Sequence, residues 1–276
     1  LEKTLDVDAL LKLGEKADID ALGSVTVTAD GSSQKCEAQK NADLVLQNQL
    51  SGEKISHSAI RIRLGVAWDE AFCFYYRDNL EFLEKQGVQI VRFSPVHDKH
   101  LPDDLDGLLL GGGYPELYAK ALGENETIRN EIRRKAEEDM PILAECGGYL
   151  YLLKELKDEN GTGYEMAGVF SGKGYKKGKN SHFGYITVQT ERDSLYLKAG
   201  ETIKGHEFHY WESTQDENEL KMQAKKPTGK RSWPCVTVKN QVMAGFPHLY
   251  YPSLEGFGER FVQACDRYRM KRKRQQ

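Results

Sequence analysis

A short apolar run, residues 141–144, leads through Glu145 to Cys146, two glycines and the apolar sequence Tyr-Leu-Tyr-Leu. This order of residue types is typical of a buried strand that turns sharply at a nucleophile and continues as a helix. Gly147 and Gly148 leave room beside the turn, and the N-terminus of the following helix favours a thiolate. The pattern predicts a catalytic Cys146. The alternative is an inert, buried cysteine that precedes a tight turn.

Apolar segments of strand length alternate with segments of helical periodicity around this motif. The predicted strands are residues 62–68, 88–93, 105–110 and 141–144. The predicted helices are residues 78–86, 125–139 and 147–156. This alternation predicts an α/β fold, with a parallel sheet that is covered by helices on both faces.

The sequence pattern changes after residue 160, where glycine-rich turns separate shorter predicted strands. These predicted strands are residues 165–170, 183–190, 202–210, 234–238 and 241–245. A close turn at Lys239 and Asn240 predicts a hairpin between the last two strands. Residues 254–268 predict a closing helix.

The remaining segments are polar or short. Residues 6–17 predict an amphipathic helix, and residues 18–60 are poor in large apolar side chains, so we expect a linker there. Residues 267–274 hold six basic side chains, and we expect residues 269–276 to form a solvated, frayed tail.

Composition argues against several classes of protein. Lysine and arginine number 39 and aspartate and glutamate 42, and the resulting net charge of −3 argues against a general nucleic-acid-binding protein. No apolar run approaches the roughly 18 residues that span a bilayer, and no signal peptide opens the chain, so we expect no membrane partner. The five cysteines include no CxxC pair, which argues against a zinc ribbon or a disulfide framework. A cytoplasmic location fits best.

A cysteine nucleophile needs a base, and the chain has seven histidines. His248 is the favoured candidate because it follows the predicted strand 241–245 and precedes the last helix. The others are His57, His97, His100, His182, His206 and His209. A lone histidine after a strand is more often structural, so spacing alone leaves the role of His248 open.

A glycine triplet ends the predicted strand 105–110, in the sequence Leu-Leu-Gly-Gly-Gly113-Tyr-Pro-Glu116. Ligands of open parallel sheets bind beyond the carboxyl ends of the strands, and glycine lets backbone N–H groups approach a developing negative charge. A glycine triplet also serves as a plain turn. No GxxxxGK[ST] sequence occurs, so the chain as given lacks a Walker-type phosphate cradle.

Taken together, these segments resemble the class I, triad-type glutamine amidotransferase domain of the cobyrinic acid a,c-diamide synthase family. The matching pieces are Leu-Gly-Gly-Gly-Tyr-Pro-Glu116, Ala-Glu-Cys146-Gly-Gly-Tyr-Leu-Tyr-Leu, Phe183-Gly-Tyr-Ile, Gly205-His-Glu-Phe-His-Tyr210 and Ala-Gly-Phe-Pro-His248-Leu. They lie within residues 61–268. The resemblance implies a flavodoxin-like domain there, with a mostly parallel sheet and added antiparallel hairpins. Residues 1–17 resemble the last helix of an ATP-binding P-loop domain, most of which is missing.

The resemblance also implies roles for site residues. Cys146 is the expected nucleophile, His248 its base, and Gly112, Gly113 and Gly147 are expected to line the oxyanion and glutamine site. The family commonly shows His-Leu-His after the strand, and the second histidine is Tyr250 here, so only a Cys–His dyad is assigned. Glu145 is expected to be structural, because neighbouring residues of a strand point to opposite faces.

The implied function is glutamine hydrolysis that supplies ammonia for amidation of the a and c carboxylates of cobyrinic acid. Glutamine, cobyrinic acid or a related tetrapyrrole, and a P-loop domain are the expected partners. ATP and Mg²⁺ are expected in the full-length enzyme, and no cofactor within this chain. A Ni-sirohydrochlorin a,c-diamide synthase and an inactive docking module remain as alternatives.

The segment 205–210 holds two histidines and a glutamate, residue types that bind metal ions. Alternation along a strand places His206, Phe208 and Tyr210 on one face and Glu207 and His209 on the other. Because His206 and His209 do not share a face, we expect no metal there.

Overall fold

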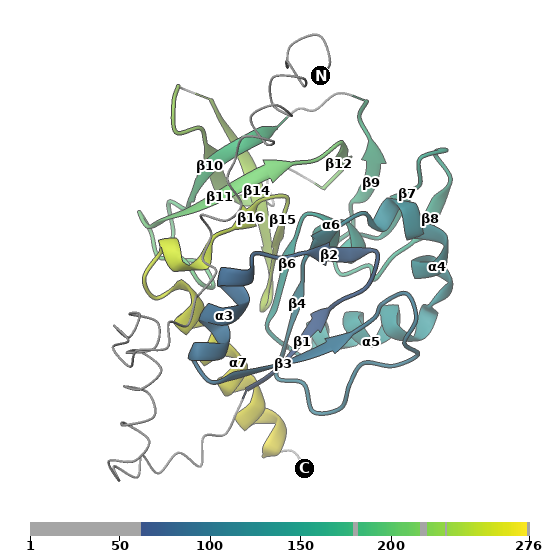
Figure 1. The fold of residues 1–276 in the computed structure, drawn as a ribbon, viewed down its shortest axis with the longest axis horizontal. Helices are drawn as coiled ribbons and strands as arrows, with labels where there is room; N and C mark the ends of the chain where they lie inside the picture. The colour runs from purple at the N-terminus through teal and green to yellow at the C-terminus, as the bar shows by residue number, and fades with distance from the viewer. Residues whose placement is uncertain (1–61, 179–181, 216–219, 230, 275–276) are drawn as a thin grey trace, which may run out of the picture. The chain divides into compact units, whose positions relative to one another are not determined.

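A ten-stranded mixed sheet lies at the centre of the described chain, with the strand order β16-β11-β10-β13-β14-β15-β6-β4-β1-β3 (Figure 1). The computed structural model describes residues 62–178, 182–215, 220–229 and 231–274. The predicted first helix and the predicted linker lie outside these residues, and so do Cys36 and His57.

One half of the sheet is parallel, as predicted. Its strands are β3 (Val88–Phe93), β1 (Ile62–Ala67), β4 (Gly107–Leu110), β6 (Ile142–Glu145) and β15 (Val242–Gly245), each parallel to the next. Leu108 and Leu110 of β4 join one buried apolar cluster, and Leu109 joins a second. Because successive side chains point to opposite faces, a strand that is apolar throughout must be covered on both.

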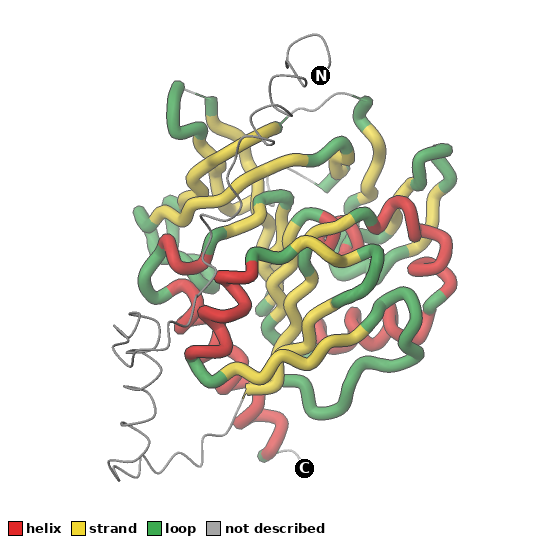
Figure 2. The backbone as a smooth tube through the Cα atoms, viewed as in Figure 1, coloured by secondary structure: helices red, strands yellow, loops and turns green. Residues whose placement is uncertain are grey.

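Helices provide that cover, as Figures 1 and 2 show. Leu83 of α3 and Phe257 and Phe261 of α7 join the cluster of Leu109. Ile128 and Ile132 of α5, spaced by one helical turn, join the cluster of Leu108 together with α4 and α6. The bounds are α3 (Arg77–Lys85), α4 (Ala119–Glu124), α5 (Glu126–Glu137), α6 (Gly147–Leu152) and α7 (Phe257–Lys273).

The other half of the sheet is antiparallel. It continues from β15 through β14 (Ser232–Lys239), β13 (Leu220–Lys225), β10 (Phe183–Gln189), β11 (Thr202–Phe208) and β16 (His248–Leu249). The predicted hairpin is confirmed, because Lys239 of β14 pairs with Val242 of β15. Asn240 turns the chain there with a φ of 52°, a conformation that asparagine tolerates.

Two expectations in the middle of the chain are wrong. The predicted helix 147–156 ends at Leu152, because residues 155–157 form β7, which pairs with β8 and β9. The predicted strand 165–170 is replaced by β8, which ends at Glu165. The small sheets contain β7 (Glu155–Lys157), β8 (Gly163–Glu165), β9 (Lys173–Lys176) and β12 (Trp211–Ser213), and β2 (Phe72–Phe74) with β5 (Gly112–Gly113).

The basic C-terminal segment differs from the expected frayed tail. Helix α7 begins at Phe257 and continues to Lys273. Arg269 is buried, and the guanidinium of Arg272 bonds to Asp104 and lies 3.0 Å from Asp106 Oδ1. Acidic side chains in the loop before β4 therefore stabilise a helical conformation in the basic segment. The charge pattern by itself had predicted a solvated tail there.

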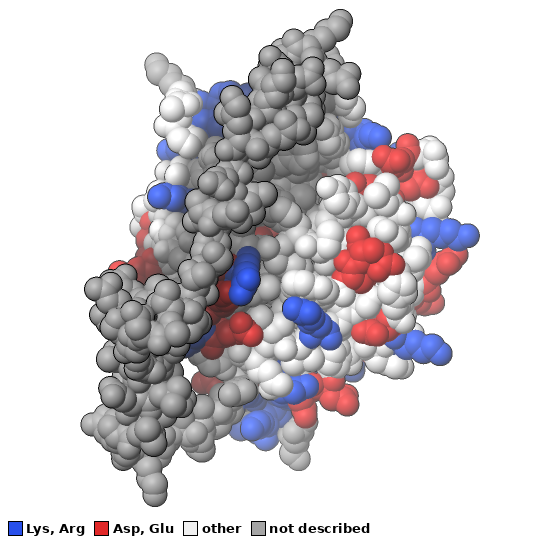
Figure 3. Space-filling view, viewed as in Figure 1, with Lys and Arg blue, Asp and Glu red and all other residues white. Residues whose placement is uncertain are grey.

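Charged side chains of both signs are interspersed over the described surface that Figure 3 shows. Among the described residues, no helix combines the length and the apolar character that a membrane crossing requires.

Candidate active site

Cys146 lies at the sharp turn between β6 and α6, as predicted. Its φ of 50° and ψ of −103° are unusual for a residue with a side chain. The turn is held at its two sides, because the Cys146 N–H donates to the Gly245 carbonyl at 2.8 Å and the Gly148 N–H donates to the Gly111 carbonyl at 2.8 Å. A Cβ on Gly148 would lie 2.1 Å from the Leu110 carbonyl oxygen, so this position requires glycine.

The glycine loop after β4 and the imidazole of His248 lie against each other. A Cβ added to Gly112 would be 2.3 Å from His248 Cε1. One added to Gly147 would be 3.1 Å from the Gly113 backbone nitrogen. The structure thus brings together all five residues that the sequence nominated, with Cys146 next to Gly147 in the turn.

Three elements hold His248 in place. Its strand β16 pairs with β11, with His248 opposite His206. The Asn79 amide of α3 donates to the Leu249 carbonyl at 2.7 Å. The ring of Phe74 contacts the imidazole edge-on, with the ring centroids 4.6 Å apart. The imidazole is therefore fixed by segments far from it in the sequence.

Glu145 has two sets of contacts, one structural and one with His248. Its carboxylate accepts hydrogen bonds from the Tyr251 hydroxyl at 3.0 Å and the Leu249 N–H at 3.4 Å, which supports the expected structural role. Its Oε2 also lies 4.0 Å from His248 Nδ1. The sequence did not predict this acidic neighbour of His248, because an acidic residue is expected two positions after the histidine and Tyr250 stands there.

Burial keeps the acid and the base of this pair neutral. It raises the pKa of Glu145 to about 8, against the hydrogen bonds from Tyr251 and Leu249. It also lowers the pKa of His248 to about 3, and His206 and His209 lower it further. The contact between Glu145 and His248 is therefore not an ion pair near neutral pH.

The thiol of Cys146 departs from expectation. Burial raises its pKa to about 12, the charge of Glu116 adds to the rise, and only the Gly147 N–H acts against it. The sequence predicted that the helix N-terminus would favour a thiolate. That expectation is wrong, because the six-residue α6 cannot offset the desolvation of a fully buried sulfur.

Glu116, the last residue of the motif that contains the glycine triplet, is a second buried carboxyl group. It lies in the short 3₁₀ helix Pro115–Tyr118 that follows the glycine loop. Burial raises its pKa to about 7. Its charge contributes to the raised pKa of Cys146, which places it in the electrostatic surroundings of the sulfur.

Apart from His206, which lies opposite His248, the other described histidines divide into two groups. His97 and His100 are exposed and pair with Glu70 and Glu131. His182 and His209 lie with Glu207 in a separate cluster. The predicted alternation of segment 205–210 is confirmed, because Glu207 and His209 are buried while Phe208 and Tyr210 are exposed.

Solved structures share the fold. One reported as the structure of PurLQS from Thermotoga maritima has a TM-score of 0.52 and 18% sequence identity, and covers 76% of this chain and 99% of its own. A second, described as a glutamine amidotransferase, has a TM-score of 0.50 and 18% identity, with 74% and 98% coverage. At this identity the likeness concerns the fold alone.

Curated relatives are closer in sequence. The cobyrinate a,c-diamide synthase of Caldanaerobacter subterraneus subsp. tengcongensis is 38% identical over 209 residues, which are 75% of this chain and 46% of the relative. The protein of the same name from Picrophilus torridus is 36% identical over 265 residues, 96% of this chain and 51% of the relative. The chain thus spans about half the length of these relatives.

The model of one protein family matches most of the sequence. It is described as the CobB/CobQ-like glutamine amidotransferase domain, and it matches residues 63–254. This range includes the turn at Cys146, the glycine loop and His248. The chain belongs to the family of CobB/CobQ-like glutamine amidotransferase domains.

Proposed function

We propose that this chain is the glutamine-hydrolysing part of an ATP-dependent cobyrinic acid a,c-diamide synthase. The observation that carries the proposal is the strained turn at Cys146, beside a glycine loop against which His248 is packed. The names of the relatives supply the acceptor, since both are called cobyrinate a,c-diamide synthase.

In the proposed mechanism the neutral imidazole of His248 accepts the proton of Cys146 while the sulfur bonds to the carboxamide carbon of glutamine. The backbone N–H groups of Gly113 and Gly147 stabilise the oxyanion. The imidazolium then protonates the departing nitrogen, the C–N bond breaks, and ammonia leaves. Water, deprotonated by His248, cleaves the thioester to glutamate and the free thiol.

The resting site holds both groups in their neutral forms. A thiol with a pKa near 12 is protonated at neutral pH, and an imidazole with a pKa near 3 is unprotonated, although a base of so low a pKa is a weak proton acceptor. The reaction therefore needs a proton transfer within the complex rather than a preformed thiolate.

The second half of the reaction is proposed to occur outside this chain. The 276 residues hold no GxxxxGK[ST] sequence, so we place ATP and Mg²⁺ on the P-loop half of the complete enzyme. There, ammonia would displace the activating group from a carboxylate of cobyrinic acid. We also propose a cytoplasmic location, since the four described cysteines are free thiols.

An exposed aromatic patch supports docking of that half. The patch comprises Phe183 and Tyr185 of β10, Phe208 of β11 and the adjacent Tyr210, with exposures from 42% to 76%. It borders His206, which is paired with His248. Exposed aromatic surface of this kind marks an interaction site, and its place beside the catalytic histidine suits transfer of ammonia.

The test is covalent labelling by a glutamine-analogue diazoketone, read by mass spectrometry on the full chain co-expressed with the ATP-binding half of a curated relative. We expect one adduct on Cys146. Cys146→Ser should abolish it, while Cys73→Ser, which removes an exposed thiol, should leave it unchanged. A folded complex without the adduct would overturn the proposal and favour the docking module.

A further inference from the structure

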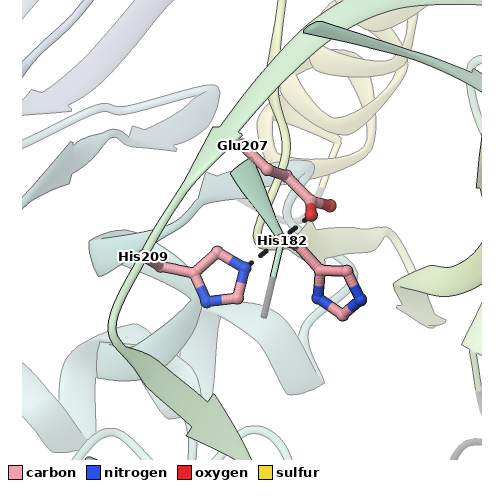
Figure 4. Close-up of side chains that lie close together, drawn as sticks. All are labelled: His182, Glu207 and His209. Carbon is pink, nitrogen blue, oxygen red and sulfur yellow. Dashed lines mark ion pairs between the residues drawn. The ribbon is translucent and has the colours of Figure 1, made fainter. Parts of the chain in front are cut away.

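A second cluster of chemically active side chains lies apart from the glycine loop. Figure 4 shows Glu207 and His209, from the end of β11, together with His182, from the segment that leads into β10. One possible ligand atom from each lies within 4.8 Å of the others. Glu207 and His209 are buried and His182 is half-buried.

The tautomer of the His209 ring follows from its hydrogen bond to Trp211. Its Nδ1 lies 2.7 Å from the Trp211 carbonyl oxygen, which can only accept, so Nδ1 carries the proton. In the neutral ring Nε2 therefore presents a lone pair. This Nε2 is buried without a hydrogen-bond partner and faces Glu207 Oε2 at 3.7 Å.

That arrangement is unfavourable without a cation. A lone pair and a carboxylate repel each other, and the alternative imidazolium is 3.7 Å from its acceptor, which is too long for a hydrogen bond. A metal ion between the two groups would satisfy both. Histidines that bind metals commonly donate their other N–H to a backbone carbonyl, as His209 does to Trp211.

Neighbouring aromatic rings orient all three side chains. Trp233 Nε1 donates to Glu207 at 3.1 Å and 3.4 Å from its two oxygens. The ring of Trp233 also stacks on His182, with centroids 4.3 Å apart. Phe246 stacks on His209 at 4.0 Å. The three side chains line a cavity of about 150 Å³, which leaves space for an ion and a water molecule.

We propose that His182, Glu207 and His209 bind a divalent transition-metal ion of the Zn²⁺ type. Two imidazoles and one carboxylate are a common ligand set for zinc, with Zn–N distances of about 2.0–2.1 Å and an open fourth position. The set includes Glu207 and His209 from one strand face, as alternation requires. It replaces His206, which lies on the opposite face, by His182 from the neighbouring chain segment.

The site would tie the entry of β10 to the end of β11. Its cavity is also lined by Tyr149, which lies on the helix after Cys146, and by Phe246, which follows β15. Metal binding would therefore stabilise the side of this cavity that is formed by elements of the candidate active site. This inference does not depend on glutamine hydrolysis.

The test is titration of the metal-free full chain with Zn²⁺ against a chromophoric chelator, with Co²⁺ as a spectroscopic probe. We expect one Zn²⁺ per chain, and ligand-field bands of tetrahedral Co²⁺ without a thiolate charge-transfer band. His182→Ala and Glu207→Gln should each weaken binding by more than about 100-fold, since loss of outer-shell groups alone costs about 10- to 100-fold. His206→Ala, on the opposite face of β11, is the matched control and should bind as the parent does.

Far-ultraviolet circular dichroism would confirm that each variant is folded, and His182→Ala carries the least folding risk because this side chain is half-buried. Equal Zn²⁺ affinity in the parent, His182→Ala and Glu207→Gln would overturn the proposal, and so would a thiolate charge-transfer band, which would assign the ion to a cysteine. Failure of the parent to bind Zn²⁺ would overturn it as well. None of these outcomes bears on labelling of Cys146.

Discussion

The parallel and antiparallel halves of the central sheet contribute different things to the candidate active site. The parallel half supplies the turn at Cys146 after β6, the carboxyl group of Glu145 and the glycine loop that includes Gly113. The antiparallel half supplies the imidazole of His248, on β16. It also carries the separate buried pair Glu207 and His209.

The difference follows from how the two halves are buried. Strands β4 and β6 are buried along their whole length, and the chain leaves them through the glycine loop and the turn at Cys146. Strand β11 alternates between buried and exposed positions and can carry polar groups at its boundary. The comparison indicates that the geometry of the turn at Cys146 is set locally, whereas the protonation state of His248 is set by long-range packing.

Removal of the base should have the largest effect. We expect His248→Ala to slow diazoketone labelling of Cys146 by about 10²–10⁴-fold in the co-expressed complex, the usual contribution of a general base. His100→Ala, which changes an exposed histidine, is the control and should label at the parent rate. Equal labelling of the two variants would show that the antiparallel half contributes no base.

Displacement of the base should have a smaller effect. A methyl group on Gly112 would be 2.3 Å from His248 Cε1, so Gly112→Ala must move the imidazole. We expect a loss of about 100-fold in glutaminase kcat/KM, the scale of a misplacement by about 1 Å. Gly123→Ala, where the nearest atom is 3.1 Å away on Tyr164, is the matched control. A parent-like Gly112→Ala enzyme would contradict the observed packing.

The pH dependence of alkylation tests the buried thiol. The raised pKa of Cys146, about 12, predicts that iodoacetamide labelling of this residue rises about tenfold per pH unit from pH 7 to 9, because the thiolate fraction does. Peptide mass spectrometry separates it from the exposed Cys73. A plateau below pH 8 would show that the helix N-terminus stabilises the thiolate after all.

The buried carboxyl of Glu145 should make the free energy of unfolding depend on pH. Its pKa of about 8 lies above the 4.5 of an exposed glutamate, so the folded state binds the extra proton between these values. The contribution of this group to the free energy of unfolding should therefore be fully present below pH 4.5. It should then decrease by about 1 kcal/mol per pH unit between pH 4.5 and pH 8. In Glu145→Gln that contribution disappears, and urea unfolding at several pH values measures the difference. Parallel pH profiles of the two proteins would exclude a neutral Glu145.

Much of the parallel half could be predicted from local pattern. The strands at 62–68 and 88–93 and the helix 125–139 were found within a few residues, because apolar periodicity reports burial directly. The short strands β7 and β12 were missed, since their pairing partners lie in other segments. The helical course of Arg269 and Arg272 was missed for the same reason, because it depends on Asp104 and Asp106.

The sequence by itself determined the turn at Cys146, the glycine loop and the candidacy of His248, because each rests on residues that are adjacent in the chain. Only the tertiary structure decided that Glu145 faces His248, that the thiol is protonated, and that His182 joins Glu207 and His209. The physical reason is that desolvation and Coulomb interactions depend on distance in space, and folding alone brings these groups together.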